Sequence, residues 1–389
     1  MIFPREVLRK VKPHLNSKEA IIITGMRRTG KTTLLSLIYD GIESQNKILL
    51  DLENPLNRKY FEEENYERIR SSFEFLGIDF TRKPFIFLDE IQFVRNLPSV
   101  VKYFIDHYHV KFFLTGSAGY YLKNLFTESL AGRKYIFELF PLNFSEFLLF
   151  KGASLKIPEN PQNITLAIFS AISPFYDEYI LYGGFPEVVL KTSVEEKKRS
   201  LEDIFTSYFQ LEVVQLGNFR RNEVIRDLML LLMQRAGTKL DITRISRELG
   251  VSRITLNEYI SFLDGTYFIK LARPFSKGKD TELRKMPKVY LCDTGIANQF
   301  AKLDDGRLFE NSVFQSLRQK GDVNYYQKKS GAEIDFILDK KWAYEVKLNP
   351  EESDIRKLKE ITGELKLDGF RIVSRKYSEL KDVSYGFMA

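Results

Sequence analysis

The stretch Ile21–Leu37, with the sequence IIITGMRRTGKTTLLSL, decides the fold of this chain. It opens with three β-branched residues, Ile21–Ile23, which are typical of a short buried strand. The next residues, Gly25–Thr32, fit the pattern G-x-x-x-x-G-K-[ST] of a phosphate-binding loop. Apolar residues then recur from Leu34 to Ile38 at the spacing of a helix. Strand, loop and helix therefore stand in the order that a phosphate-binding loop requires.

The residue types in this loop suit a bound triphosphate. Gly25 and Gly30 let the backbone turn so that its N–H groups point at phosphate oxygens, and the following helix directs its positive dipole end to the same anion. We expect Lys31 to reach the β- and γ-phosphates of ATP and the Thr32 hydroxyl to bind Mg²⁺. The residues expected to contact the nucleotide are Gly25, Arg27, Arg28, Thr29, Gly30, Lys31, Thr32 and Thr33. The alternative is a glycine-containing turn with a solvated lysine.

A second motif follows downstream. The residues Pro84–Glu90, PFIFLDE, form an apolar strand that ends in two acids, the Walker B pattern. We expect Asp89 to lie at the carboxyl end of the strand beside the Mg²⁺ held by Thr32, and Glu90 to polarise the attacking water as a general base. The alternative is a surface turn after a buried strand.

Three further strands complete the predicted core. The first is Lys47–Leu52, and a charged amphipathic helix is expected after it at roughly Arg58–Leu76. The residues Val110–Thr115 predict a buried strand, after which Thr115 or Ser117 is expected to face the γ-phosphate as a sensor. Serine and threonine at strand ends are also ordinary caps. The residues Lys134–Leu139 predict a fifth strand. Alternating strands and helices indicate an α/β fold with a parallel sheet covered on both faces, and a ligand then belongs at the carboxyl ends of the strands.

Length and composition limit the class of protein. A chain of 389 residues is too long for one ordinary core, so two to four domains are expected. No apolar run approaches the ~20 residues needed to cross a bilayer, and the first residues lack the apolar core of a signal peptide. Cys292 is the only cysteine, which excludes internal disulfides and favours a cytoplasmic location. With three histidines beside it, a zinc site is not expected.

The net charge of +7 permits nucleic-acid binding without establishing it. Basic residues cluster at Lys197–Arg199, at Arg220–Arg221 and along Arg273–Lys288. We interpret each cluster as a solvated surface.

The residues Thr238–Arg273 predict a winged helix-turn-helix. Asp241 or Thr243 would cap a short first helix, Gly250 would make the tight turn, and Ser252 would cap the second helix. The apolar positions of the second helix are Ile254, Leu256, Tyr259, Ile260 and Leu263, and its outward positions are Arg253, Thr255, Asn257 and Ser261. The outward positions suit a DNA major groove, and the alternating residues from Tyr267 to Leu271 suit a wing. The alternative is a winged helix that binds protein.

The last hundred residues contain a second polar constellation. The residues Gly306–Arg318 predict a helix with Glu310 on or beside its apolar face. A predicted hairpin centred on Lys340 joins two strands and places Asp335 directly opposite Glu345, with Cβ atoms roughly 5 Å apart. Facing carboxylates repel each other unless a cation lies between them, so the sequence predicts a Mg²⁺ or Mn²⁺ site here. Lys347 would share a face with Glu345 and stabilise charge on a phosphate.

The pattern Glu310, Asp335, Glu345-Val346-Lys347 resembles the PD-(D/E)XK nuclease superfamily, although Asp335 stands in GAEID and not after the usual proline. The resemblance implies that Glu310, Asp335 and Glu345 bind the metal and that Glu345 and Lys347 are catalytic. Two alternatives remain: a surface salt bridge between Glu345 and Lys347, or a nuclease-like fold that only binds.

Six stretches together resemble one family, the prokaryotic AAA-type ATPases with a C-terminal DUF4143 domain. They are Gly25–Thr33, LDEIQ (88–92), TGS (115–117), LAGR (130–133), ELFPLNFSEF (138–147) and YGGFPEV (182–188). The resemblance implies an ASCE P-loop core with the catalytic glutamate beside Walker B. Arg133 matches the family's candidate arginine finger, which reaches a neighbouring subunit's nucleotide and so implies a ring or a dimer. From the residues alone, Arg133 is a basic residue after a turn.

The predicted organisation has four parts: a P-loop AAA-type core at 1–157, a helical lid at 158–236, a winged helix at 237–279 and a PD-(D/E)XK nuclease-like domain at 280–389. Residues 151–163, polar and proline-containing, are the expected linker. The predicted function is a Mg²⁺-dependent ATPase that binds DNA, with metal-dependent nuclease activity left open. The alternative is a slow ATP-dependent switch that binds a protein partner, with the winged helix as the docking surface and the nuclease fold inactive.

Overall fold

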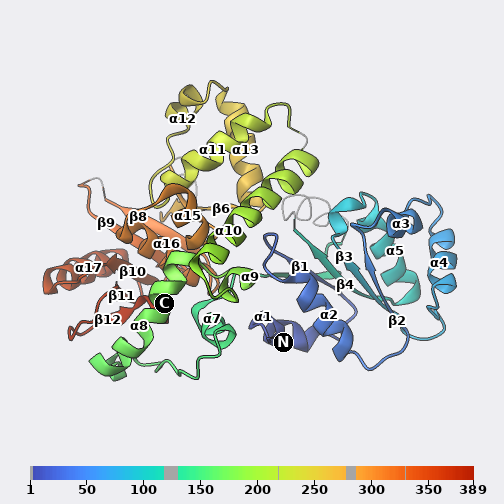
Figure 1. Cartoon of the computed structure of the whole chain (residues 1–389), viewed down its shortest axis with the longest axis horizontal. Coiled ribbons are helices and arrows are strands. Elements are labelled where there is room, and N and C mark those ends of the chain that lie inside the picture. Colours follow the sequence, from blue (N-terminus) through green and yellow to red (C-terminus); the bar gives the residue numbers. More distant parts are fainter. Residues whose placement is uncertain (1–2, 118–129, 218, 277–285, 329) are drawn as a thin grey trace. The chain divides into compact units, whose positions relative to one another are not determined.

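The computed structural model describes residues 3–389 except 118–129, 218, 277–285 and 329 (Figure 1). The chain forms two compact units. The first unit comprises Met1–Phe140 with Gly265–Tyr267, and the second comprises Pro141–Asp264 with Phe268–Ala389.

The first unit is built on a five-stranded parallel sheet with the order β2-β3-β4-β1-β5. Its strands are β1 (Ala20–Thr24), β2 (Lys47–Asp51), β3 (Phe85–Asp89), β4 (Lys111–Gly116) and β5 (Lys134–Glu138). The predicted parallel α/β sheet is therefore confirmed. Strand β4 stands between β1, which leads into the glycine-containing loop, and β3, which carries the two acids.

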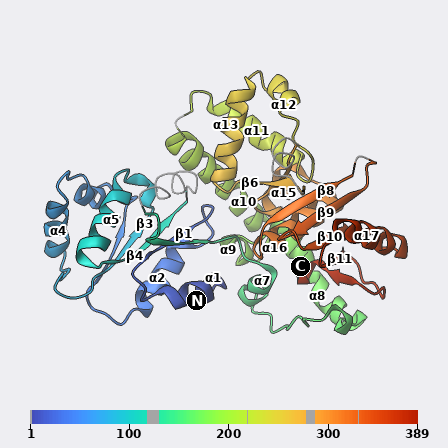
Figure 2. The same cartoon turned by 180° about the vertical axis from the view of Figure 1, so that it is seen from behind.

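Helices cover both faces of this sheet, as Figures 1 and 2 show from opposite sides. The described helical elements of the first unit are α1 (Val7–Val11), η1 (Lys12–His14), α2 (Lys31–Gly41), α3 (Pro55–Arg58), η2 (Lys59–Phe61), α4 (Tyr66–Phe75), η3 (Ile91–Phe93) and α5 (Leu97–Tyr108). Side chains of a strand alternate between faces, so Ile21 packs with Leu35 of α2 whereas Ile22 packs with Phe104 of α5. One continuous helix from 58 to 76 was the wrong prediction, because Asn65 caps a separate helix, α4, with its side chain.

The second unit contains a seven-stranded mixed sheet with the order β12-β11-β10-β9-β8-β6-β7. Its strands are β6 (Ile269–Pro274), β7 (Lys288–Leu291), β8 (Val323–Gln327), β9 (Glu333–Leu338), β10 (Trp342–Lys347), β11 (Gly369–Ser374) and β12 (Val383–Tyr385). On β9, Phe336 contacts the ring of Phe314 from α16, whereas Ile337 packs with Leu358 of α17. Helices α16 and α17 therefore lie on opposite faces of this sheet.

The described helices of the second unit are α7 (Phe144–Phe150), η4 (Pro161–Asn163), α8 (Leu166–Tyr182), α9 (Pro186–Val189), α10 (Val194–Tyr208), η5 (Phe209–Leu216, a π-helix), α11 (Asn222–Gln234), α12 (Ile242–Glu248), α13 (Arg253–Gly265), α15 (Thr294–Ala301), α16 (Asp305–Arg318), α17 (Glu352–Leu365) and η6 (Gly386–Met388). No helix among the residues with a described structure is long and apolar enough to span a bilayer.

Two glycines join distant parts of the second unit. Gly183 has a left-handed φ of 76°, and a Cβ added there would overlap the carboxylate of Asp293. The N–H of Gly184 donates to Oδ2 of Asp293 (2.7 Å), and its carbonyl accepts from the N–H of Leu142 (2.7 Å). Oδ1 of the same aspartate accepts from the N–H of Gly295 at the start of α15. The stretches ELFPLNFSEF and YGGFPEV therefore meet in a buried structural junction.

The only cysteine lies beside this junction. Cys292 is 3% exposed, and its N–H donates to the carbonyl of Phe268 (3.1 Å). Burial, together with the neighbouring charge of Asp293, raises the pKa of the Cys292 thiol far above its ordinary value. The thiol is therefore protonated and unreactive at physiological pH.

The predicted helix-turn-helix corresponds to α12 and α13. The side chain of Asp241 accepts from the N–H of Arg244 and so is the cap of α12, while Ser252 accepts from the N–H of Thr255. Ile254 was predicted as an apolar core position but is 74% exposed. It lies outside the buried stripe of α13, whose members are Leu256, Tyr259, Ile260, Phe262 and Leu263.

Of the residues predicted to form a wing, residues 269–271 belong instead to β6 of the seven-stranded sheet. Strand β6 pairs antiparallel with β7 and, at Arg273 and Pro274, parallel with β8. The connection between β6 and β7 includes residues 277–285, which lie outside the described part of the chain.

Candidate active site

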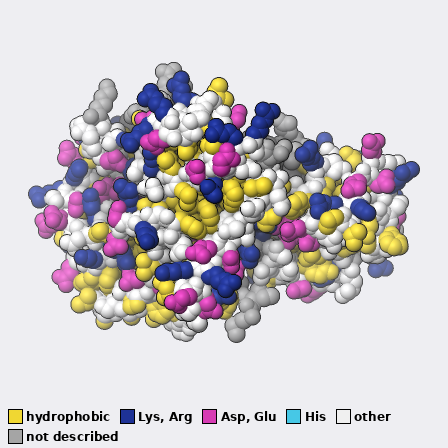
Figure 3. Space-filling model, turned by 45° about the horizontal axis from the view of Figure 1, so that its top comes forward, with side chains coloured by type: hydrophobic (Ala, Val, Ile, Leu, Met, Phe, Trp, Pro, Cys, Tyr) yellow, Lys and Arg dark blue, Asp and Glu magenta, His cyan; other side chains and the backbone are white. Residues whose placement is uncertain are grey.

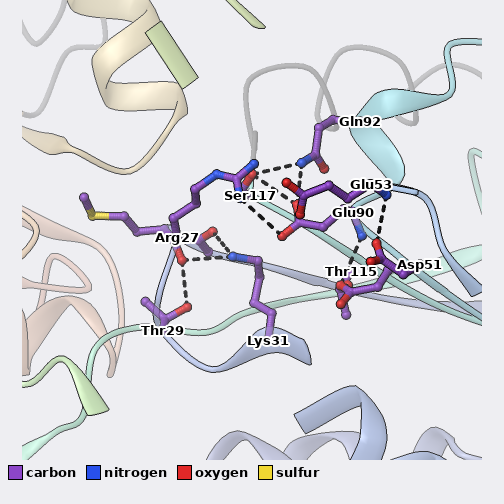
Figure 4. A network of polar contacts seen from close by, with 12 residues as sticks. Arg27, Thr29, Lys31, Asp51, Glu53, Glu90, Gln92, Thr115 and Ser117 are labelled. Carbon is purple, nitrogen blue, oxygen red and sulfur yellow. Dashed lines mark hydrogen bonds and ion pairs between the residues drawn. The ribbon is translucent and has the colours of Figure 1, made fainter. Parts of the chain in front are cut away.

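The carboxyl ends of β1, β3 and β4 lie at one edge of the first unit's sheet, because the three strands run parallel. The loop Gly25–Gly30 follows β1, Asp89–Glu90 end and follows β3, and Thr115–Ser117 end and follow β4. Figure 4 shows side chains from these segments converging. The structure thus groups these residues at the edge where the sequence predicts a ligand.

The loop holds its lysine inward. Gly30 precedes α2 with a left-handed φ of 93°, a conformation that favours glycine. Lys31 is buried, and its Nζ donates to the carbonyls of Gly25 (3.0 Å) and Met26 (2.9 Å). The Arg5 guanidinium donates to the carbonyl of Thr29 (2.7 Å), which anchors the loop to the N-terminal segment. The ammonium therefore lies inside the loop, at the place where phosphate oxygens are the preferred partners.

The acid that ends β3 is oriented by its neighbours. Asp89 is buried, accepts a hydrogen bond from the Thr115 hydroxyl, and accepts another from the N–H of Glu90 (3.1 Å). Thr115 is thus a partner of Asp89. Of the two residues predicted as sensors, Ser117 is the one whose hydroxyl lies beside Glu90.

Three side chains surround the carboxylate of Glu90. Gln92 donates from Nε2 to Oε2 at 2.5 Å, the Ser117 hydroxyl lies 3.5 Å from the same oxygen, and an Arg27 nitrogen lies 3.8 Å from Oε1. Gln92 also donates to the Ser117 hydroxyl (3.1 Å). Glu90 has a left-handed φ of 54°, which directs its side chain to this position. The predicted general base is therefore held in one orientation.

The role of Gln92 was missed in the sequence. The signal was present in LDEIQ, where Gln92 stands two residues after Glu90. The left-handed backbone at Glu90 turns the chain so that the side chains of Glu90 and Gln92 come together. Hydrophobic periodicity does not predict such a turn.

Arg133 lies at the opposite edge of the sheet. It immediately precedes β5, so it stands at the amino ends of the parallel strands, and its Nε pairs with Oδ1 of Asp106 (2.7 Å). A groove of about 780 Å³ lies there, lined by Lys18, Arg82, Lys83, His109, Arg133 and other residues. Arg133 therefore lies at the sheet edge away from the phosphate loop of its own chain.

The second constellation assembles in the second unit as its register predicts. Strands β9 and β10 pair antiparallel with Phe336 opposite Tyr344, so the hairpin is centred on Lys340. Oδ2 of Asp335 accepts from the N–H of Val346 (2.8 Å). Nζ of Lys347 lies 3.0 Å from Oε1 of Glu345. Asp335 and Glu345 are close enough for their charges to interact.

Three residues that the sequence prediction omitted enter this cluster. Nζ of Lys288 lies 2.5 Å from Oε1 of Glu333, 3.5 Å from Oε1 of Glu310 and 4.0 Å from Oδ1 of Asp335. The Tyr290 hydroxyl donates to Glu310 (2.6 Å). Glu333 had a sequence signal, since it stands two residues before Asp335 on the same strand; Lys288 and Tyr290 had none.

Three acids of the cluster, Glu310, Asp335 and Glu345, hold protons more tightly than usual. Burial, reinforced by the charge of Asp335, raises the pKa of Glu310 to about 7 and that of Glu345 to about 7. Burial also raises the pKa of Asp335. For Lys288, the charges of Glu310 and Asp335 outweigh the opposing effect of burial, and its pKa is raised. The lysine is therefore charged, and its charge does not fully offset burial and the mutual repulsion of the acids.

The cluster does not fit the predicted metal ion. Among the residues that the structure describes, no group of three or more acid, histidine or cysteine side chains is arranged to hold one. The ammonium of Lys288 lies among three of the carboxylates instead. At the first unit's edge the donor set differs, because a P-loop site takes its Mg²⁺ ligands from a hydroxyl, an acid and the substrate's own phosphates. Thr32 and Asp89 fit that requirement.

Two basic residues are not solvated as predicted. Lys197 is 5% exposed and pairs with Glu178 (2.6 Å), and Lys288 is 6% exposed within the acid cluster. Lys197 lies on the buried face of α10, and all four residues of β7 are buried, so a carboxylate partner replaces water at both lysines.

Comparisons with known proteins give weak likenesses to solved structures and clearer relationships in sequence. Among solved structures, the chain is similar to a signal-transduction ATPase with numerous domains (STAND) from Pyrococcus horikoshii, with a TM-score of 0.31, 14% identity, and 82% of this chain and 45% of that chain covered. It is also similar to the Aeropyrum pernix ORC2 protein in its ADP form, with a TM-score of 0.33, 11% identity, and 77% and 90% covered. Likenesses this weak carry no argument about this chain.

Relatives in sequence span most of the chain. An uncharacterized protein of Methanocaldococcus jannaschii is 28% identical over 376 residues, which cover 92% of this chain and 82% of the relative. An uncharacterized protein of Haemophilus influenzae is 25% identical over 359 residues, which cover 86% and 84%.

Three family models match in turn. Residues 174–307 match a domain of unknown function, DUF8612, and residues 305–385 match the domain of unknown function DUF4143, which confirms that part of the predicted resemblance. Residues 17–148 match the model of an AAA domain. Over residues 17–148, this chain is therefore similar to the AAA-type P-loop ATPase family.

Proposed function

We propose that the first unit is a Mg²⁺-dependent ATPase in which Glu90 is the general base. The observation that carries the proposal is the grouping at one sheet edge of the inward-facing Lys31, the buried Asp89 and the oriented Glu90. Such a set is what phosphoryl transfer to water requires: a cation on the phosphates, an acid for the metal and a base for the nucleophile.

Each residue then has a defined task. Lys31 binds the phosphates, and Thr32 and Asp89 hold Mg²⁺, which when bound neutralises phosphate charge. Glu90 accepts a proton from water, since its carboxylate is fixed by Gln92. Ser117, at the end of β4, is placed to contact the γ-phosphate.

Two substitutions test this assignment. Lys31→Ala is expected to lose binding of a fluorescent ATP analogue, whereas Glu90→Gln is expected to bind it normally and release phosphate at least about 100-fold more slowly. Unchanged phosphate release by Glu90→Gln would contradict the role of the base.

We further infer that DNA is the partner of α12 and α13. Arg253, Asn257 and Ser261 are exposed on α13, as expected of a helix that reads a major groove. Figure 3 shows, on the face it presents, Lys and Arg side chains interleaved with Asp and Glu. The affinity for duplex DNA should therefore be modest and should fall steeply between ~50 and ~300 mM salt, because phosphate contacts release counterions.

Substitution of α13 tests the DNA proposal. Arg253→Ala is expected to weaken binding to duplex DNA and to reduce its salt dependence by about one charge. Asp203→Asn, an exposed change on α10, serves as the control and should bind as the wild type does. Binding that does not depend on salt would argue against a DNA interface.

A second candidate is an ATP-dependent switch that binds a protein. It is favoured by the exposed Ile254 on the outward face of α13, an apolar contact that a protein partner would bury. Replacement by aspartate should abolish binding of such a partner. Under the DNA proposal, the same Ile254→Asp variant would weaken DNA binding by charge repulsion instead.

The geometry does not support the metal-dependent nuclease suggested by the sequence pattern, since Lys288 lies among the acids. No nicking of duplex, branched or single-stranded DNA is expected with Mn²⁺, with or without ATP. Nicking that disappears in Glu345→Ala while ATP hydrolysis persists would restore the nuclease assignment.

A further inference from the structure

A buried lysine lies where the sequence pattern predicts a metal ion in the second unit. The side chain of Lys288 is 7% exposed, and its Nζ lies within 4.0 Å of carboxylate oxygens from Glu310, Glu333 and Asp335. A buried ammonium is tolerated only where opposite charges surround it. Two of these carboxylates, Glu310 and Asp335, are among the ligands that the sequence pattern assigns to a divalent cation.

The position of Lys288 is set by the backbone. Two residues further along β7, Tyr290 stacks on Phe314 of α16, with ring centroids 4.1 Å apart, and donates to Glu310. The N–H of Leu291 donates to Oδ1 of Asn311, a fully buried residue of the same helix (2.8 Å). Strand β7 is thus fastened to α16 at two points, and these fix the distance from Lys288 to Glu310.

The same cluster carries more acids than bases. Its four carboxylates are Glu310, Glu333, Asp335 and Glu345, and its two lysines are Lys288 and Lys347. Lys347 forms an ion pair with Glu345 at the edge of the cluster and also pairs with Asp354 (3.6 Å). Lys288 is therefore the cation that serves the other three acids.

We propose that Lys288 is the built-in counter-cation of this carboxylate cluster and that it excludes Mg²⁺ and Mn²⁺ from the place the sequence pattern assigns to them. A metal bound there would lie within a few ångströms of the ammonium and would be repelled by it. The metal also needs oxygens at about 2.0–2.1 Å, whereas these oxygens face Nζ. The proposal holds whether or not the first unit hydrolyses ATP.

The test is a titration of nucleotide-free, full-length protein with MnCl₂, followed by the electron paramagnetic resonance signal of free Mn²⁺. Wild type is expected to bind no Mn²⁺ with a Kd below ~1 mM. Lys288→Met, which keeps the length of the side chain and removes its charge, is expected to bind one Mn²⁺ at least about tenfold more tightly. The added Asp335→Asn should abolish the gained site.

A matched control is available in the same neighbourhood. Lys239 and Lys288 each place Nζ 5.6 Å from the ring of Tyr325, but Lys239 bonds the amide of Gln327 and none of the cluster's acids. Lys239→Met should therefore gain no Mn²⁺ site. A gain equal to that of Lys288→Met would overturn the proposal, because it would show a general effect of charge.

If Lys288→Met fails to fold by circular dichroism, wild type and two other variants still test the proposal. Glu333→Gln, which removes the nearest partner of the ammonium, should lower the melting temperature of the second unit if the lysine neutralises the acids. A rise in that temperature, stoichiometric Mn²⁺ binding by wild type that Asp335→Asn abolishes, or a folded Lys288→Met that gains no metal would each overturn the proposal.

Discussion

The side-chain amide of Gln92 donates a hydrogen bond of 2.5 Å to the carboxylate of Glu90. Since an amide has no charge to supply, the contact orients the carboxylate without neutralising it. The second donation of Gln92, to Ser117, ties the same orientation to the end of β4. Gln92 is thus placed to position the base relative to the residue that would meet the γ-phosphate.

Gln92→Ala is expected to lower kcat for ATP hydrolysis by about tenfold while the Kd for ATP stays within about twofold, because the base loses its orientation and the phosphate loop is untouched. Gln92→Glu should be worse, since a second carboxylate would repel that of Glu90 and, when ionised, could not donate the hydrogen bond that orients it. Phosphate release and analogue binding measure the two quantities. The exposed Gln45→Ala is the control. Equal losses in kcat and affinity would assign Gln92 a purely structural role.

Arg133 is expected to act on the nucleotide of a second copy of the chain, because it lies at the sheet edge away from its own loop. Arg133→Ala and Lys31→Ala should each be nearly inactive, and a mixture of the two should recover activity that rises with protein concentration. Arg82→Ala, which changes another cation of the same groove, is the control. Full activity of Arg133→Ala, or no recovery on mixing, would remove the intersubunit role.

Gly183→Ala is expected to lower the free energy of unfolding of the second unit by about 3 kcal/mol, because it combines a left-handed backbone with an overlap against Asp293. Gly152 separates the two effects. It has a similar φ of 68° with no atom near an added Cβ, so Gly152→Ala should cost only about 1 kcal/mol. Urea unfolding measures both, and equal costs would show that the overlap is relieved by a shift of Asp293.

Asp293 makes stability depend on pH. Burial raises its pKa to about 6 from 3.8, although hydrogen bonds from backbone N–H groups oppose the rise. The folded chain therefore binds this proton more tightly than the unfolded chain does, and the free energy of unfolding falls as pH rises from about 4 to 6. The loss reaches at most roughly 3 kcal/mol and is complete above pH 6.

Asp293→Asn should remove this part of the pH dependence, while also costing stability at every pH because its amide cannot accept from both flanking segments. Urea unfolding of wild type and variant at pH 4.5 and pH 7 measures the difference in slope. The exposed Asp203→Asn on α10 should leave the slope unchanged. Equal slopes for Asp293→Asn and wild type would mean that the aspartate is ionised throughout.

The site residues of the first unit could be predicted from the sequence because the motifs that contain them are short and local. The spacing from Gly25 to Thr32 and the strand ending at Asp89 are each readable in a few residues, and parallel strands bring their ends to one edge. The hairpin register that sets Asp335 near Glu345 was equally local. Each of these features depends on contacts within one strand, one turn or one pair of neighbours.

The features that the sequence did not reveal depend on distant contacts. Lys288 meets Glu333 although their strands, β7 and β9, are separated in the sheet order by β6 and β8. No pattern along the chain predicts such a meeting, so a basic residue in a basic stretch was interpreted as solvated. The prediction for Ile254 was wrong for a different reason. Ile254 was assigned to the core because it is apolar, although its position around α13 lies away from the buried stripe.

The inert, hidden thiol of Cys292 has a practical consequence. One cysteine introduced at an exposed position of each unit would give two reactive attachment points for maleimide dyes or nitroxides, with no competition from Cys292. One label on each unit would then report, as a distance distribution, whether nucleotide changes the arrangement of the two units, without first replacing any natural residue.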